Sequence, residues 1–365
     1  MILLLMACTQ PEDSAQPVDL RGTASALAER GAQTWPAEDL PFDWMQTVWA
    51  YGVWSLREDW TQDYAADWML DNLSRFEGED PAAFHSSDSM SPSLLASLLM
   101  TENPSLKLEP IVEAGHAYLA VAPKTAEGAY EHWGPDSVFG EVGEVWIDSQ
   151  FMIGMFLLAE YDRTGDPSHL QSWVEQYELF SLHCRDEQDQ LYRHAWSDVE
   201  QVNIPSEAVY WNRGNSWVLV SAAEYLARVE PGSEGWNTIQ PLFEAHAQAT
   251  VAYQAEDGLW HTVLNHPEDP DNYTETAGSA LIGHALSRGL ETGALEGVDY
   301  EEAVRRSALG TLDRVDPETL VVEGTSFGTN PGDYDYYLGI VQLDDIILGV
   351  GSVVLFLNQV GEVEP

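Results

Sequence analysis

The chain has 365 residues, 44% of them hydrophobic, and its 61 acidic and 15 basic side chains give a formal net charge of −46. A surface this negative repels nucleic acid and anionic membranes, so neither is expected as a partner. Disordered acidic proteins contain few aromatic residues, whereas this chain has 14 Trp, 15 Tyr and 10 Phe, so we expect a folded protein.

The chain begins with a short apolar run, "MILLLMAC", followed by a polar stretch. Leu5 to Cys8 resembles a bacterial lipobox, which predicts a lipoprotein signal over 1–8, a lipid on Cys8 and a polar tether over 9–32. The protein would then be exported, either periplasmic or anchored to a membrane by its lipid. Because the run is short and has no basic residues before it, the alternative is an ordinary disordered start of a cytoplasmic protein. No stretch reaches the roughly 18 apolar residues of a membrane-spanning helix.

One pattern then recurs along the chain: a polar, aromatic loop, an apolar helix, a short turn and an amphipathic helix. The landmarks of four copies, Asp88, Asp148, Arg213 and Glu275, are about 60 residues apart. A repeat of this kind indicates helical hairpins stacked around an axis. Apolar helices must be buried and amphipathic helices have one exposed face, so we predict an all-α toroidal barrel over 33–360.

In such a barrel the inner helices begin at the same end, so the polar loops converge there. Asp148 precedes the apolar helix "SQFMIGMF" and is either its N-cap or a catalytic group. Asp88 occupies the equivalent place one repeat earlier, and two neighbouring carboxylates can separate their pKa values into an acid and a base. Trp133 and Trp146 flank the same loops, and aromatic faces suit sugar rings.

The later loops supply further candidates. His194 lies in "LYRHAWSD", and Arg213 and Trp217 lie four residues apart on one helix face in "WNRGNSW". Arg213 is either a salt-bridge partner or a bidentate clamp for a substrate carboxylate. Thr325 and Ser326 are either hydrogen-bond donors to that carboxylate or turn-forming residues.

Motifs for metals and cofactors are missing from the sequence. It contains no zinc or calcium ligand pattern and no phosphate-binding glycine loop. The two cysteines, Cys8 and Cys184, offer no disulfide framework. We therefore expect neither a metal ion nor a cofactor.

Several segments together resemble the unsaturated glucuronyl and rhamnogalacturonyl hydrolases of glycoside hydrolase families 88 and 105. In family order over most of 85–355 they are "SDSMSPSLL", "VWIDSQFM", "RHAWSD", "WNRGNSW", "QAEDGLWHTVLNHP", "YTETAGSALIGHAL", "EGTSFGT" and "DYYL". The resemblance implies a six-hairpin (α/α)6 barrel. It also implies hydration of the C4=C5 enol ether in a terminal unsaturated uronic acid, as left on oligosaccharides by polysaccharide lyases.

The resemblance also implies roles for individual residues. Asp148 would be the general acid/base and Asp88 the second acid, while His194, Arg213 and Trp217 would bind the unsaturated ring. Ser149, Gln150 and Ser216 depart from the residues usual in these families, and Gln150 is expected to touch the subsite beside the cleaved bond.

Two other functions fit the same barrel. One is a neutral-glycan glycosidase or sugar epimerase, which would need no carboxylate clamp at Arg213 and Ser326. The other is a non-catalytic glycan-binding lipoprotein, which would tolerate loss of the Asp148 carboxylate. The sequence leaves the parent polysaccharide and the oligomeric state open.

Overall fold

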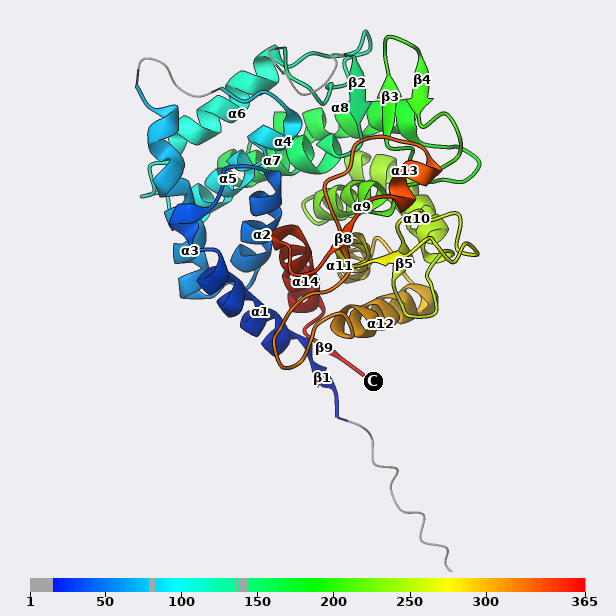
Figure 1. The fold of residues 1–365 in the computed structure, drawn as a ribbon. Helices are drawn as coiled ribbons and strands as arrows, with labels where there is room; N and C mark the ends of the chain where they lie inside the picture. The colour runs from blue at the N-terminus through cyan, green and yellow to red at the C-terminus, as the bar shows by residue number, and fades with distance from the viewer. Residues whose placement is uncertain (1–15, 79–82, 136, 138–142, 365) are drawn as a thin grey trace, which may run out of the picture.

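The computed structural model describes residues 16–78, 83–135, 137 and 143–364. In these residues six helices form an inner ring, in which each contacts the next (Figure 1). They are α2 (Trp44–Ser55), α5 (Ser93–Glu102), α7 (Ser149–Thr164), α9 (Asn212–Leu226), α11 (Thr276–Thr292) and α14 (Ile347–Val360). Their outer partners are α3 (Asp59–Leu73), α6 (Glu109–Val121), α8 (Pro167–Cys184), α10 (Glu234–Val251), α12 (Val298–Leu312) and α1 (Leu20–Thr34). The predicted all-α, six-hairpin barrel is confirmed.

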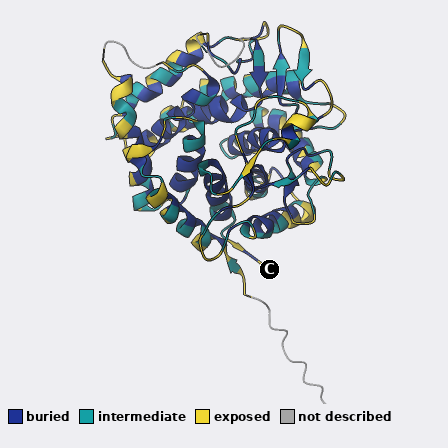
Figure 2. Cartoon of the chain, viewed as in Figure 1, coloured by how far each residue is buried: buried dark blue, intermediate teal, exposed yellow. Residues whose placement is uncertain are grey.

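Burial follows the sequence pattern that predicted the two rings. Every residue of α9 is buried, and α7 is buried from Ser149 to Glu160. In the outer helix α8 only Trp173, Tyr177, Phe180 and Cys184 are buried, at the three- and four-residue spacing of a single helix face. Figure 2 shows the same contrast, with dark inner helices and outer helices that are dark on one side only.

The two ends of the described chain close the ring. Helix α1 packs against α14, and the short strands β1 (Val18–Asp19) and β9 (Glu362–Val363) pair antiparallel beside them. The first and last helices therefore form the sixth hairpin. No described helix combines the length and the apolarity needed to cross a bilayer.

This closure corrects the predicted start of the barrel. We expected a tether over 9–32, but residues 20–34 form α1, in which Leu20, Ala24, Leu27, Ala28 and Gly31 are buried. The helix was missed because small residues line its buried face, so its hydrophobic pattern is weak. The predicted signal and the lipid site at Cys8 lie outside the described residues and stay predictions.

Short strands organise the loops that precede the inner helices. Strands β2 (Glu144–Trp146), β3 (Ala195–Ser197) and β4 (Val202–Ile204) form an antiparallel sheet before α7 and α9. Strands β5 (Trp260–His261) and β6 (Thr274–Glu275) pair before α11, and β7 (Thr325–Ser326) and β8 (Gln342–Leu343) pair before α14. Two short helices, α4 (Ser87–Met90) and α13 (Tyr334–Leu338), lie in the loops before α5 and α14.

The inner helices α2 and α14 approach so closely that glycine is required. A Cβ on Gly351 would lie 2.5 Å from the Cα of Trp49. We expect Gly351→Ala to lower the free energy of unfolding by about 1–3 kcal/mol, because two helix backbones would have to separate. Gly339→Ala is the control, since its Cβ would meet nothing closer than 3.4 Å. Urea unfolding of both variants checks this, and equal stabilities would contradict it.

Candidate active site

Asp148 follows strand β2 and occupies the N-cap position of α7, as the sequence predicted. Its side chain, however, makes no capping hydrogen bond. The carboxylate is instead almost buried, and its Oδ2 lies 3.1 Å from Nε2 of His194. Capping therefore does not account for this carboxylate.

Strand pairing brings Asp148 and His194 together across 46 residues of sequence. In the β2–β3 ladder Trp146 pairs with Ala195, and the N–H of Ile147 donates to the carbonyl oxygen of His194 over 3.0 Å. The residues that follow β2 therefore lie beside the residue that precedes β3.

The ring of His194 is completely buried and held on two sides. Trp211 stacks on it, with ring centroids 4.3 Å apart and an interplanar angle of 26°. Its Nδ1 atom lies 3.0 Å from the hydroxyl oxygen of Tyr337. The ring therefore presents Nε2 to Asp148 in a fixed orientation.

A second carboxylate and histidine lie beside this pair. The Oδ2 atom of Asp88 is 3.7 Å from Nε2 of His132, and Nδ1 of His132 is 2.9 Å from the hydroxyl of Ser87. Trp146 stacks on His132 with centroids 4.0 Å apart and an angle of 11°. Trp133 meets the same imidazole edge-on at 4.5 Å.

The pKa values of the two carboxyl groups are shifted in opposite directions. Burial raises the pKa of Asp88 well above its usual value, and the negative charges of Asp148 and Asp43 raise it further. Burial also raises the pKa of Asp148, but the neighbouring His194 outweighs it, so the net shift of that pKa is downward. Burial lowers the pKa of His132 to about 3, which leaves it neutral. Of the two carboxyl groups, Asp88 is therefore the one that binds a proton more tightly, and Asp148 is the one more readily ionised.

The raised pKa of Asp88 predicts a pH-dependent effect on stability. The folded protein binds this proton more tightly than the unfolded chain, whose Asp pKa is about 3.9. Stability is therefore lost as pH rises from that value through the folded-state pKa. We expect Asp88→Asn to be more stable than the wild type at neutral pH and to lose this advantage near pH ~3. Urea midpoints across pH measure it, and a difference independent of pH would contradict it.

Arg213 does not have the geometry of a free carboxylate clamp. Its side chain is completely buried. Its Nη1 atom donates to the backbone oxygen and hydroxyl of Ser326, at 3.0 and 2.7 Å, and lies 3.4 Å from Glu275. Its Nη2 atom donates to the Phe327 carbonyl at 2.7 Å and to Thr329 at 3.2 Å. The salt-bridge alternative is therefore the one observed, and Arg213 holds the loop that follows β7.

Four other predicted binding residues, Trp217, Gln150, Thr325 and Ser326, are also buried. Trp217 has no exposed surface and packs against Phe151 at 4.8 Å. Gln150 lines a small cavity between α7 and α8, and its expected place beside the cleaved bond stays a prediction. Thr325 and Ser326 are fully buried, and Thr325 packs against Gly349 of α14.

The structure adds three residues that the sequence analysis did not select, His132, Trp211 and Tyr337. Two were adjacent to selected motifs: His132 precedes Trp133 in "EHWGP", and Trp211 opens "WNRGNSW". Tyr337 lies in "DYYL", 143 residues after the histidine that it contacts, and no spacing rule connects them.

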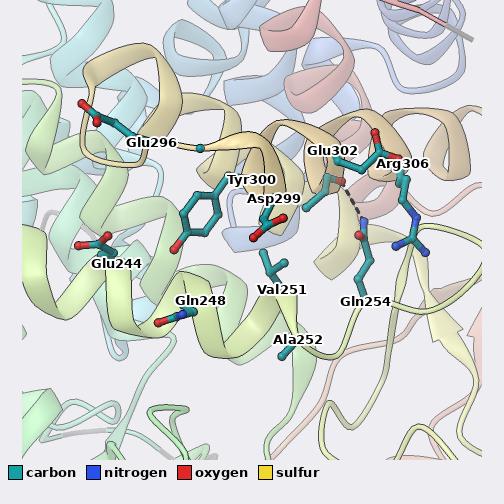
Figure 3. Close-up of a pocket in the computed structure, with 12 residues that line it drawn as sticks. Glu244, Gln248, Val251, Ala252, Gln254, Glu296, Asp299, Tyr300, Glu302 and Arg306 are labelled. Carbon is teal, nitrogen blue, oxygen red and sulfur yellow. Dashed lines mark hydrogen bonds between the residues drawn. The ribbon is translucent and has the colours of Figure 1, made fainter.

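An unrelated groove of about 550 Å³ lies between the outer helices α10 and α12 (Figure 3). Four carboxylates line it, from Glu244, Glu296, Asp299 and Glu302, against the single cation of Arg306. Such a lining disfavours an anionic sugar. None of the candidate site residues contributes to it, and no group of three His, Cys, Asp or Glu side chains in the described ranges is arranged to hold a metal ion.

Comparison with solved structures supports the fold. The chain is similar to a possible member of the GH105 family from Klebsiella pneumoniae, with a TM-score of 0.83, 20% identity and coverage of 96% of this chain and 95% of that one. It is also similar to the unsaturated glucuronyl hydrolase from Bacillus sp. GL1, with a TM-score of 0.69, 16% identity and coverage of 93% and 95%. At these identities the likeness concerns the fold alone.

Curated relatives match over part of their length. The chain is 29% identical to the unsaturated rhamnogalacturonyl hydrolase YesR of Bacillus subtilis over 232 residues, which is 62% of this chain and 63% of that protein. It is 27% identical to an unsaturated 3S-rhamnoglycuronyl hydrolase of Formosa agariphila, over 52% of each. The chain thus spans somewhat more than half the length of these relatives.

The model of Glycosyl Hydrolase Family 88 matches residues 24–362, which include α1 from Ala24 onward and all the inner helices. This confirms the resemblance found in the sequence, and the chain belongs to Glycosyl Hydrolase Family 88.

Proposed function

We propose that this glycoside hydrolase hydrates the C4=C5 enol ether of a terminal unsaturated uronic acid on lyase-generated oligosaccharides and so releases the aglycone. The observation that carries the proposal is the buried contact between Asp148 and His194, with Asp88 coupled to it by charge. The relatives named as unsaturated uronyl hydrolases support the substrate class.

The chemistry needs one group that first donates and then accepts a proton. Protonated Asp148 gives its proton to C4 while the π electrons form the new C4–H bond, and positive charge develops at C5 and the ring oxygen. Water adds to C5 and passes a proton to the Asp148 carboxylate. The resulting hemiketal opens to a C5 ketone, and the C1 hemiacetal then releases the aglycone as an alcohol. The net addition is one water molecule.

The proton must reach Asp148, which is the more readily ionised of the two carboxyl groups. A bound uronate places another negative charge near the pair and excludes water, and both effects raise the pKa of Asp148. The two carboxylates then have similar affinities for a proton, so the proton on Asp88 can pass to Asp148. Asp88 is in this account the proton reservoir of the pair.

Aromatic and dipolar groups around the pair suit a charged sugar. Trp133, Trp146 and Trp211 surround the two imidazoles, and aromatic faces pack against sugar rings. The inner helices begin at this end of the barrel, so their positive dipole ends favour a carboxylate. A short oligosaccharide carries few charges, which limits its repulsion by a chain at −46.

We also propose that the protein acts outside the cytoplasm, anchored by a lipid on Cys8. The support is the lipobox-like sequence Leu5 to Cys8. Labelling cells with a radioactive or clickable fatty acid tests this. Label on the wild type that is lost in Cys8→Ala supports the anchor, and unlabelled wild type contradicts it.

A substrate panel tests the activity. Purified protein is mixed with unsaturated disaccharides from lyase digests of pectin, ulvan and glycosaminoglycans, and the ultraviolet absorbance of the enol ether is followed. Loss of absorbance with one digest supports the proposal and identifies the parent polymer. Unchanged absorbance with every digest, while the folded protein cleaves a neutral glycan or only binds glycans, would favour the alternatives.

A further inference from the structure

Tyr337 lies in the short helix α13, in a segment that the reaction scheme leaves without a role. It is completely buried and belongs to a small apolar cluster with Val209, Trp211 and Val263. Its ring is nearly parallel to that of Trp211, at an angle of 7°. Packing against these side chains therefore fixes the position of the Tyr337 ring.

The Tyr337 hydroxyl has two neighbours among the described residues. Its oxygen accepts a hydrogen bond from the N–H of Gly332 over 3.2 Å and lies 3.0 Å from Nδ1 of His194. Burial and the charge of Asp148 raise the pKa of Tyr337, so its hydroxyl keeps its proton. Among the described residues His194 Nδ1 is the one acceptor within reach of the hydroxyl hydrogen, and a buried O–H left without an acceptor would cost free energy, so we take the hydroxyl to donate to Nδ1.

We propose that Tyr337 is a positioning residue that holds His194 in the tautomer with its hydrogen on Nε2. A neutral imidazole carries one N–H, and the nitrogen that accepts a hydrogen bond cannot also carry it. The hydrogen therefore lies on Nε2, 3.1 Å from Oδ2 of Asp148. The meaning of this arrangement for catalysis rests on the proposed function, whereas the tautomer itself does not.

The tautomer of His194 decides whether the Asp148 carboxylate faces an N–H group or a nitrogen lone pair. An N–H at Nε2 stabilises the ionised carboxylate, the form that accepts a proton from water in the second half of the reaction. Without the tyrosine hydroxyl, the hydrogen can move to Nδ1, and the Nε2 lone pair would then face the carboxylate. Losing this stabilisation raises the pKa of Asp148, so the pH profile of turnover moves to higher pH.

The chain offers a matched control for Tyr337→Phe. The neighbouring Tyr336 also accepts a hydrogen bond from the same loop, from the N–H of Asn330 over 3.2 Å, but the structure gives its hydroxyl no histidine neighbour. Tyr336→Phe therefore removes a comparable loop contact and leaves His194 untouched. Phenylalanine keeps the aromatic packing at both positions.

The first test is nitrogen NMR of the full chain labelled with ¹⁵N-histidine, with His194→Gln used to assign the ring signals. We expect His194 of the wild type and of Tyr336→Phe to carry its hydrogen on Nε2, and Tyr337→Phe to show both tautomers. A wild-type ring protonated on Nδ1 alone, or a Tyr337→Phe spectrum identical to the wild type, would overturn the proposal. This readout needs no substrate, so it stands even if no unsaturated uronate is turned over.

The second test is the pH dependence of turnover in the same proteins. We expect Tyr337→Phe to lower kcat roughly tenfold, with little change in KM, and to move the profile upward by about 0.5–1 pH unit. Tyr336→Phe should keep the wild-type profile. A lower kcat with an unshifted profile would mean that Tyr337 only supports the fold, and equal shifts in both variants would assign the effect to the loop.

Discussion

Asp148→Asn is expected to lower kcat on an unsaturated disaccharide by about 10²–10⁴-fold while leaving substrate affinity within about tenfold. Asparagine is nearly isosteric and can still fill the site, but it has no proton to give to C4 and cannot accept one from water. Single-turnover kinetics and equilibrium binding to the purified variant measure the two quantities separately. Near wild-type turnover would show that another group carries the proton.

The N-cap interpretation of Asp148 supplies the control for this experiment. Asp166 caps the neighbouring outer helix α8 and accepts a hydrogen bond from the Ser168 N–H over 2.9 Å. Asparagine is as good an N-cap as aspartate, so Asp166→Asn should keep full turnover. Asp148 makes no such hydrogen bond. The free energy of unfolding of Asp148→Asn should therefore lie within about 1 kcal/mol of the wild-type value. A larger loss of stability would show that the fold depends on the Asp148 carboxylate itself.

Arg213→Met is expected to lower the free energy of unfolding by roughly 3–5 kcal/mol, since it removes one partner of a buried ion pair. Glu275 would remain buried, with backbone N–H groups of Ala277, Gly278 and Ser326 as its remaining partners. The loop after β7 would lose the donors that hold Ser326, Phe327 and Thr329. Urea unfolding monitored by tryptophan fluorescence measures the change.

A double variant separates this structural role from a carboxylate clamp. Arg213→Met combined with Glu275→Gln leaves no unpaired buried charge, so it should recover part of the lost stability. In both variants, residual binding should fall equally for uronates and for neutral sugars. Wild-type stability together with a loss confined to uronates would instead establish Arg213 as a direct clamp.

The fold was predictable because its two signals are local. Apolar helices such as α7 and α9 alternate with amphipathic ones such as α8, and this alternation specifies inner and outer rings. The exception is α1, whose buried face contains Ala24, Ala28 and Gly31. Small residues bury little apolar area, so its place is set by contact with α14 at the far end of the chain, which no local pattern reveals.

The candidate site was predictable in part. Asp88, Asp148, His194, Trp133 and Trp146 are the predicted residues that the structure brings together, through strand pairing and ring stacking. Sequence identified the residue types at the ends of inner helices, but not which way each side chain points. Arg213, Trp217 and Gln150 also lie near the starts of inner helices. Their side chains, however, are buried in the protein. Tyr337 was inaccessible to sequence reasoning because its partner His194 comes from a distant hairpin.

Hydration at C5 can be separated from hydrolysis at C1 with an unsaturated uronate joined to its aglycone through carbon, a bond that hydrolysis cannot break. The measurement is the ultraviolet absorbance of the enol ether in this compound, incubated with the wild type and with Asp148→Asn. We expect the wild type to abolish the absorbance and the variant to preserve it, since proton transfer to C4 does not require the C1–O bond. Absorbance that persists with a wild type that cleaves the corresponding oxygen glycoside would contradict hydration by Asp148.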